Sequence, residues 1–214
     1  MDRHRSNPHA LVAISSILCL KGDELGKVII SISYQSRLNQ GLFLPNFTRL
    51  PLVARTFYLR LHERFIDSFK LPPQRRGYEL EKIFTDLMKI SNIPVEESFK
   101  IEGEQIDGAI KYDSYYYIVE LKWTANKVNQ AQISSLYMKV EGKMQSLGLF
   151  ISMNGYSQEA LESLTRGKPM QIILLDGTHL MSVISGIRTF KELLEHARKE
   201  ASLKGNIYCS HDIS

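Results

Sequence analysis

The sequence of 214 residues predicts an α/β fold, in which a mixed sheet is flanked by helices and preceded by a mainly helical N-terminal region. Apolar residues recur at helical spacing over residues 77–91 and 127–146. Between them, residues 115–123 are rich in β-branched and aromatic side chains, as is typical of a half-buried strand. The resulting order of elements, α-β-β-β-α-β, favours a sheet with both antiparallel and parallel strand pairs.

The N-terminal part is predicted to be helical and basic. Residues 51–70 form an amphipathic helix that begins at a proline and ends before the two prolines at 72–73. This boundary divides the chain into a basic region over 1–74 and a core with C-terminal helices over 75–214. The apolar run at 10–20 is too short to span a membrane and is interpreted as a buried helix.

Helices and strands alternate through the core, and turn-forming residues separate them. In chain order we expect a helix at 77–91, strands at 95–101, 105–112 and 115–123, a helix at 127–146, a strand at 147–153, a helix at 158–165, a strand at 170–175, and helices at 178–185 and 189–203.

The second and third strands are predicted to form a hairpin that turns at residues 113–114. Folding back at this turn brings Asp107 level with Glu120. Alternation along the strand places Glu120 and Lys122 on the same face. Two carboxylates and one ammonium group are therefore expected to converge.

Such a group is suited to the hydrolysis of a phosphodiester. Mg²⁺ prefers oxygen ligands, and a bound metal lowers the pKa of a coordinated water and offsets charge on the phosphate. Lys122 can orient or deprotonate the attacking water and stabilise the transition state. Mn²⁺ is expected to substitute for Mg²⁺, whereas zinc and iron are disfavoured because no histidine lies nearby in the sequence. A structural ion pair between Glu120 and Lys122 is the alternative.

These residues resemble the PD-(D/E)xK nuclease superfamily, and within it the Mrr-like restriction endonuclease group. The resemblance covers about residues 76–185, and the segments that carry it are RGYELEK (76–82), QIDG (105–108), VELKW (119–123) and GLFIS (148–152). It implies a restriction-endonuclease-like core in which Asp107, Glu120 and Lys122 are catalytic. The chain departs from the superfamily pattern at Ile106, where a proline is usual.

The resemblance also implies a metal-binding glutamate on the first core helix. Glu81 has the expected spacing from Gly77, and Glu79 is the alternative. Residues two apart on a helix project about 200° apart, so only one of them can face the site. The implied catalytic set is therefore Asp107, Glu120, Lys122 and Glu81, of which the three carboxylates hold the metal.

Two groups of polar residues are candidates for DNA contact. Amides at the start of the second core helix are suited to phosphate binding, as in related nucleases. Residues 1–76 hold 12 Lys/Arg against 5 Asp/Glu, whereas residues 77–214 hold 15 against 18, so the helix at 51–70 lies in the basic part. A solvated polar surface is the alternative for both groups. The candidates are Gln130, Gln132, Arg55, Arg60 and Arg64.

The sequence thus predicts a metal-dependent DNA endonuclease that acts in restriction of foreign DNA, as an antiviral defence. A repair or junction-cleaving nuclease, or a catalytically silent DNA-binding subunit, are the alternatives. The two cysteines are too few for a disulfide framework, so we expect a cytoplasmic protein. Its expected partners are DNA and either a second copy of the chain or a larger defence complex, without a membrane.

Overall fold

We describe residues 52–101, 104–164 and 171–209 of a computed structural model of the protein. All of them belong to one compact unit that spans Phe43–Ser214. The predictions for residues 1–51, including the buried helix at 10–20, lie outside the described residues.

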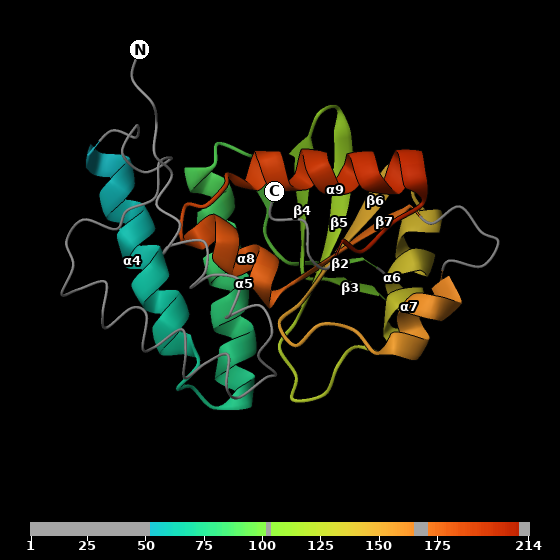
Figure 1. Ribbon diagram of the computed structural model, residues 1–214, viewed down its shortest axis with the longest axis horizontal. Coiled ribbons are helices and arrows are strands. Elements are labelled where there is room, and N and C mark those ends of the chain that lie inside the picture. The colour runs from blue at the N-terminus through green and yellow to red at the C-terminus, as the bar shows by residue number, and fades with distance from the viewer. Residues whose placement is uncertain (1–51, 102–103, 165–170, 210–214) are drawn as a thin grey trace, which may run out of the picture. The chain divides into compact units, whose positions relative to one another are not determined.

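The order of elements confirms the predicted α/β class (Figure 1). The helices are α4 (Leu52–Ser68), α5 (Pro73–Ile90), α6 (Gln130–Glu141), α7 (Gln158–Leu164), α8 (Gly177–Ile184) and α9 (Phe190–Lys204). The strands are β1 (Val95–Glu96), β2 (Phe99–Ile101), β3 (Glu104–Ile106), β4 (Gly108–Tyr112), β5 (Tyr115–Lys122), β6 (Ser146–Ser152) and β7 (Ile172–Asp176).

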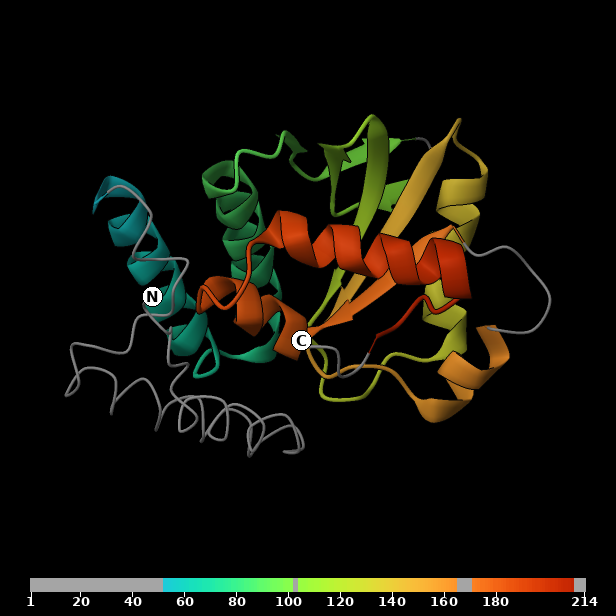
Figure 2. The ribbon, with the colours of Figure 1, turned by 45° about the horizontal axis from the view of Figure 1, so that its top comes forward.

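The main sheet is mixed, as predicted. Its five strands lie in the order β1-β4-β5-β6-β7, so β5 is the middle strand. β5, β6 and β7 are parallel, whereas β4 is antiparallel to both β1 and β5. Helix α9 runs across one face of this sheet and α6 covers the other (Figure 2). β5, the strand that carries Glu120 and Lys122, is therefore enclosed by strands on both sides and by helices on both faces (Figure 2).

Two of the predicted strands are interrupted. The strand expected at 95–101 is divided into β1 and β2, and the one expected at 105–112 is divided at Asp107 into β3 and β4. β2 and β3 pair with each other in a separate two-stranded sheet. Gly108 begins β4 where a Cβ atom would lie 3.1 Å from the carbonyl oxygen of Glu96, so a glycine favours the close approach of β1.

Two helix boundaries differ from the prediction for reasons of capping. α5 begins at Pro73 rather than at 77, because proline is well suited to the first position of a helix. α6 is shorter than the expected helix and begins after Asn129, which forms a capping box with Gln132. The side chain of Gln132 accepts a hydrogen bond from the Asn129 backbone, and its own backbone N–H donates to the Asn129 side chain.

Apolar side chains hold α6 to the sheet and join α5 to α9. On the α6 face, Ile133, Leu136 and Val140 are buried in one cluster with Phe150 of β6. On the other face, Phe84 of α5 packs edge to face against Phe190 of α9, with ring centroids 5.9 Å apart. None of the helices in the described ranges is both long and apolar enough to cross a membrane.

A buried carboxylate anchors the end of the sheet next to α8. Asp176 is the N-cap of α8 and accepts hydrogen bonds from the backbone of Thr178 and His179. Its oxygens also bind the side chains of Thr178, His179 and Tyr208. Burial acts to raise the pKa of Asp176, but the hydrogen bonds and the His179 charge outweigh it and hold the pKa well below its usual range.

Asp176→Ala should lower the free energy of unfolding by about 3 kcal/mol, because it leaves buried donors without their charged acceptor. The contribution of Asp176 is present in full above the unfolded pKa of about 4 and is lost as the pH falls below it. Urea denaturation at pH 7 and pH 3 should therefore show a difference between variant and wild type that shrinks in acid. Asp67→Ala, at an exposed ion pair with Lys70, is the control and should cost less than about 0.5 kcal/mol.

Candidate active site

The hairpin of β4 and β5 brings the predicted carboxylates together. Gly108 pairs with Val119, so the next positions along the two strands are Asp107 and Glu120. The backbone N–H of Leu121 donates to Oδ2 of Asp107 at 3.0 Å, which fixes the aspartate against β5. The predicted hairpin is thus confirmed.

The turn of this hairpin is formed by Asp113 and Ser114, which have φ angles of 48° and 67°. Positive φ at both central residues is characteristic of the tight turns that match the twist of antiparallel strands. A two-residue turn leaves no freedom in the register, so the pairing of β4 with β5 is fixed by local geometry.

Glu120 is held between two lysines. Its Oε1 lies 2.7 Å from Nζ of Lys122, and its Oε2 lies 2.9 Å from Nζ of Lys139. The ion pair within the strand, which was the alternative to a metal site, is therefore formed. The Lys122 ammonium also interacts electrostatically with Asp107.

Lys139 is a member of the site that the sequence analysis did not find. It lies on α6 and its ammonium also donates to the carbonyl oxygen of Gln105 at 2.8 Å. The signal in the sequence is weak. Lys139 precedes the buried Val140, so it borders the apolar side of α6, but a lysine in that position is common on packing helices.

The charges of the site affect one another. Burial raises the pKa of Asp107, and the negative charge of Glu120 adds to this effect. Burial also raises the pKa of Glu81, again with a contribution from a neighbouring carboxylate, Asp107. Burial acts to raise the pKa of Glu120 too, but its hydrogen bonds to Lys122 and Lys139 lower it below the ordinary value. The ionised form is therefore favoured at Glu120 and disfavoured at Asp107 and Glu81.

The two candidate glutamates of α5 have different surroundings. Glu79 accepts hydrogen bonds from Nε and Nη2 of Arg64, at 3.0 and 2.8 Å. Glu81 instead interacts electrostatically with Asp107 and Lys122. This arrangement supports Glu81 as the site residue, as the spacing from Gly77 indicated, and gives Glu79 a role in joining α5 to α4.

Part of the chain is similar to a known protein family. Residues 74–184, which are more than half of the chain, match the profile of the Mrr catalytic domain, described as a restriction endonuclease. The chain belongs to this restriction endonuclease family. The profile spans α5 to α8 and thus contains Glu81, Asp107, Glu120 and Lys122.

A solved structure of the restriction endonuclease MspJI, in complex with a 27-mer oligonucleotide, is also similar. The identity is 12%, the TM-score is 0.37, and the similarity covers 79% of this chain and 40% of that chain. The chain thus spans less than half the length of that protein. A comparison with curated proteins gives no match.

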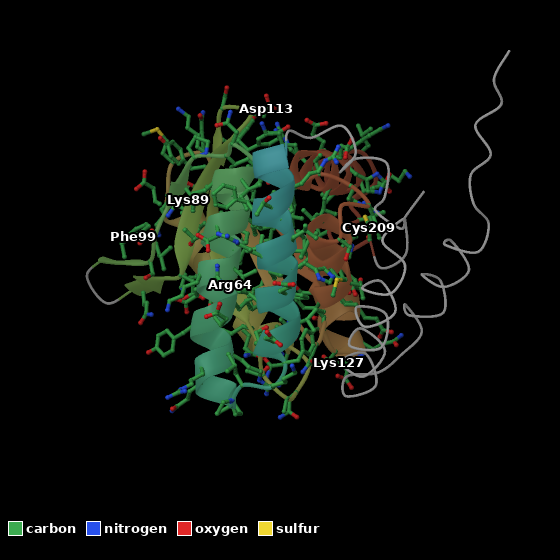
Figure 3. All side chains as sticks on the ribbon, turned by 90° about the vertical axis from the view of Figure 1, so that its left-hand side faces the viewer. Arg64, Lys89, Phe99, Asp113, Lys127 and Cys209 are labelled. Carbon is green, nitrogen blue, oxygen red and sulfur yellow. The ribbon has the colours of Figure 1, made fainter. Side chains whose placement is uncertain are left out.

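The residues predicted to contact DNA have varied surroundings. Arg64 binds Glu79 and also Asp86 of α5, and Figure 3 shows it between α4 and α5. Gln132 is engaged in the capping box of α6, whereas Gln130 and Arg60 are exposed and Arg55 is partly buried. The ion pairs of Arg64 therefore join α4 to α5. DNA contact by all five residues stays a prediction.

The metal ligands expected of this restriction endonuclease family are only partly assembled. Among the residues that the structure describes, no three His, Cys, Asp or Glu side chains are gathered closely enough to hold a metal. Asp107 and Glu120 lie side by side, and Glu81 is near enough for its charge to interact with Asp107. Two carboxylates with further oxygens from water and phosphate are a usual environment for Mg²⁺, so the residues fit this ion.

Proposed function

We propose that this protein is a metal-dependent DNA endonuclease that hydrolyses phosphodiester bonds. The observation that carries the proposal is the convergence of Asp107, Glu120 and Lys122 at the end of β5, within the segment that matches the restriction endonuclease family. Restriction of foreign DNA in the cytoplasm is the role that this family membership favours.

Asp107, Glu120 and Glu81 are the residues that would hold the metal, which we propose to be Mg²⁺, with Mn²⁺ able to substitute. The carboxylates offer the hard oxygen ligands that these ions prefer. Burial raises the pKa of Asp107 and of Glu81, and a bound cation would favour the ionised forms that burial disfavours. When bound, the metal would supply an activated water and offset the charge on the phosphate.

Lys122 provides the positive charge of the site. Burial acts to lower its pKa, but the hydrogen bond and charge of Glu120 raise it above the ordinary value, so the side chain is an ammonium group at neutral pH. We therefore assign it to orienting the attacking water and stabilising the negative charge of the transition state, rather than to removing a proton. Its side chain is 33% exposed, which leaves it accessible to a substrate phosphate.

The purified protein should convert supercoiled plasmid to open circles in the presence of Mg²⁺, and should be inactive when EDTA removes the metal. Replacement of Mg²⁺ by Mn²⁺ should restore cleavage. Agarose-gel analysis of plasmid over time measures the rate. DNA binding without any cleavage in either metal would contradict the proposal and favour a catalytically silent subunit.

Two further measurements test the cellular role and the oligomeric state of the protein. Cleavage of a four-way junction in preference to plasmid would favour a repair or junction-cleaving nuclease over restriction. One such site cuts one strand, so the appearance of linear plasmid together with a dimer in sedimentation would support a homodimer that acts on both strands. A single-strand nick by a monomer would favour action within a larger complex.

A further inference from the structure

The ammonium of Lys139 joins the two segments that carry the carboxylates of the site. It donates to Oε2 of Glu120 on β5 at 2.9 Å and to the carbonyl oxygen of Gln105 on β3 at 2.8 Å. Gln105 is the middle residue of β3, and Asp107 follows it by two residues, at the point where the chain leaves the small sheet and enters the main one. A contact to β3 therefore bears on where Asp107 lies.

The two lysines that bind Glu120 differ in the element that carries them and in the exposed fraction of their side chains. Lys122 is a neighbour on the same strand, with 33% of its side chain exposed, whereas Lys139 comes from a helix and has 16% exposed. Its position on α6 is fixed because Ile133, Leu136 and Val140 pack that helix onto the sheet. A less exposed lysine with fewer rotamers open to it is suited to hold a carboxylate in one orientation.

We propose that Lys139 is a positioning residue that holds Oε2 of Glu120 and the strand leading into Asp107, and so sets the separation of the two carboxylates for a divalent cation. The inference rests on the function proposed above. Lys122 then remains available to the substrate, since Glu120 keeps one lysine partner when Lys122 turns away. Groups that orient the ligands of a metal typically contribute 10- to 100-fold to its affinity.

If Lys139 were only a nearby positive charge, its removal would have the opposite effect on metal affinity. A positive charge close to the site repels a divalent ion and competes with it for Glu120, so removal of such a charge tightens metal binding. Removal of a positioning residue weakens metal binding, because the carboxylates lose their arrangement. The sign of the change in metal affinity therefore distinguishes the two roles.

The test is a calorimetric titration of the full-length protein with Mn²⁺, in the absence of DNA, for wild type, Lys139→Met and Lys139→Arg. We expect the Kd for Mn²⁺ to rise by about tenfold in Lys139→Met. It should stay close to wild type in Lys139→Arg, since a guanidinium can donate to both acceptors. Lys122→Met is the matched comparison and should not weaken Mn²⁺ binding. A folded Lys139→Met protein that binds Mn²⁺ as tightly as wild type, or more tightly, would overturn the inference.

A second measurement does not depend on the metal. The backbone N–H of Leu121 donates to Asp107, so its hydrogen exchange reports on the position of that carboxylate in the metal-free protein. We expect exchange at Leu121 to become about tenfold faster in Lys139→Met and to be unchanged in Lys111→Met, an exposed lysine on β4. Lys139→Gln, which keeps a neutral donor, takes the place of the methionine variant if the latter does not fold.

The two measurements separate the inference from the proposed function. If the wild-type protein neither binds Mn²⁺ nor cleaves DNA, the proposed function fails, and the exchange at Leu121 alone decides the role of Lys139. Unchanged exchange in the folded variant would then overturn the inference. Faster exchange would support a positioning role for Lys139 whatever the chemistry of the site.

Discussion

Replacing Lys122 with methionine should reduce the rate of DNA cleavage by about 10²- to 10³-fold, with DNA affinity and fold retained. The methionine side chain keeps the length of lysine but removes the charge that stabilises the transition state. The fold should be retained because Glu120 keeps its ion pair with Lys139, at 2.9 Å. Plasmid nicking at saturating Mg²⁺ gives the rate, and a binding assay in Ca²⁺ gives the DNA affinity.

The control for this variant is Lys111→Met, which makes the same chemical change on the neighbouring strand. Lys111 is exposed and its ammonium lies 5.6 Å from the centre of the Tyr116 ring, on the hairpin formed by β4 and β5. We expect cleavage by this variant to stay within about twofold of wild type, as for other surface changes. Equal activity of wild type and Lys122→Met would exclude the mechanism proposed above.

Asp107→Asn should reduce cleavage by at least about 10²-fold, because loss of a direct metal ligand is expected to exceed the 10- to 100-fold effect of its supporting groups. Asparagine still offers an oxygen to the backbone N–H of Leu121, so the local structure should be kept. Burial raises the pKa of Asp107, which means that folding disfavours its ionised form. The variant should therefore be at least as stable as wild type at pH 7.

Thermal denaturation together with plasmid nicking tests both parts of this expectation. Asp113→Asn is the matched control, since it changes an exposed aspartate of the same hairpin where a positive φ of 48° is also tolerated by asparagine. It should retain full activity. A loss of stability in Asp107→Asn that accounts for its loss of activity would show that Asp107 has a structural role only.

The parts of the site that the sequence revealed are those set by local geometry. Strict alternation along β5 places Glu120 and Lys122 together, and a two-residue turn fixes which residue of β4 lies opposite. The family resemblance supplied the choice of Glu81. Glu79 lies two positions before it on the helix and therefore projects to another side, toward Arg64.

What could not be predicted depends on contacts between distant segments. The break at Asp107 is not visible in the sequence, because Ile106 and Ala109 are buried residues that also suit a continuous strand. Lys139 is 19 residues from Glu120, and only the packing of α6 on the sheet brings them together. The ion pairs of Arg64 with Glu79 and Asp86 likewise depend on the packing of α4 against α5, and DNA contact by Arg64 stays a prediction.

The middle position of β5 has a consequence for how the proposed endonuclease activity would be lost. Hydrogen-bonded neighbours on both sides and helices on both faces make this strand one of the last to open, whereas the small sheet of β2 and β3 has no such cover from the main sheet. Glu120 and Lys122 therefore lie on a strand that is well covered, whereas Asp107 lies at the border of the two sheets. Motions that bring Asp107, Glu120 and Lys122 together or move them apart are thus expected to begin in the segment around Asp107.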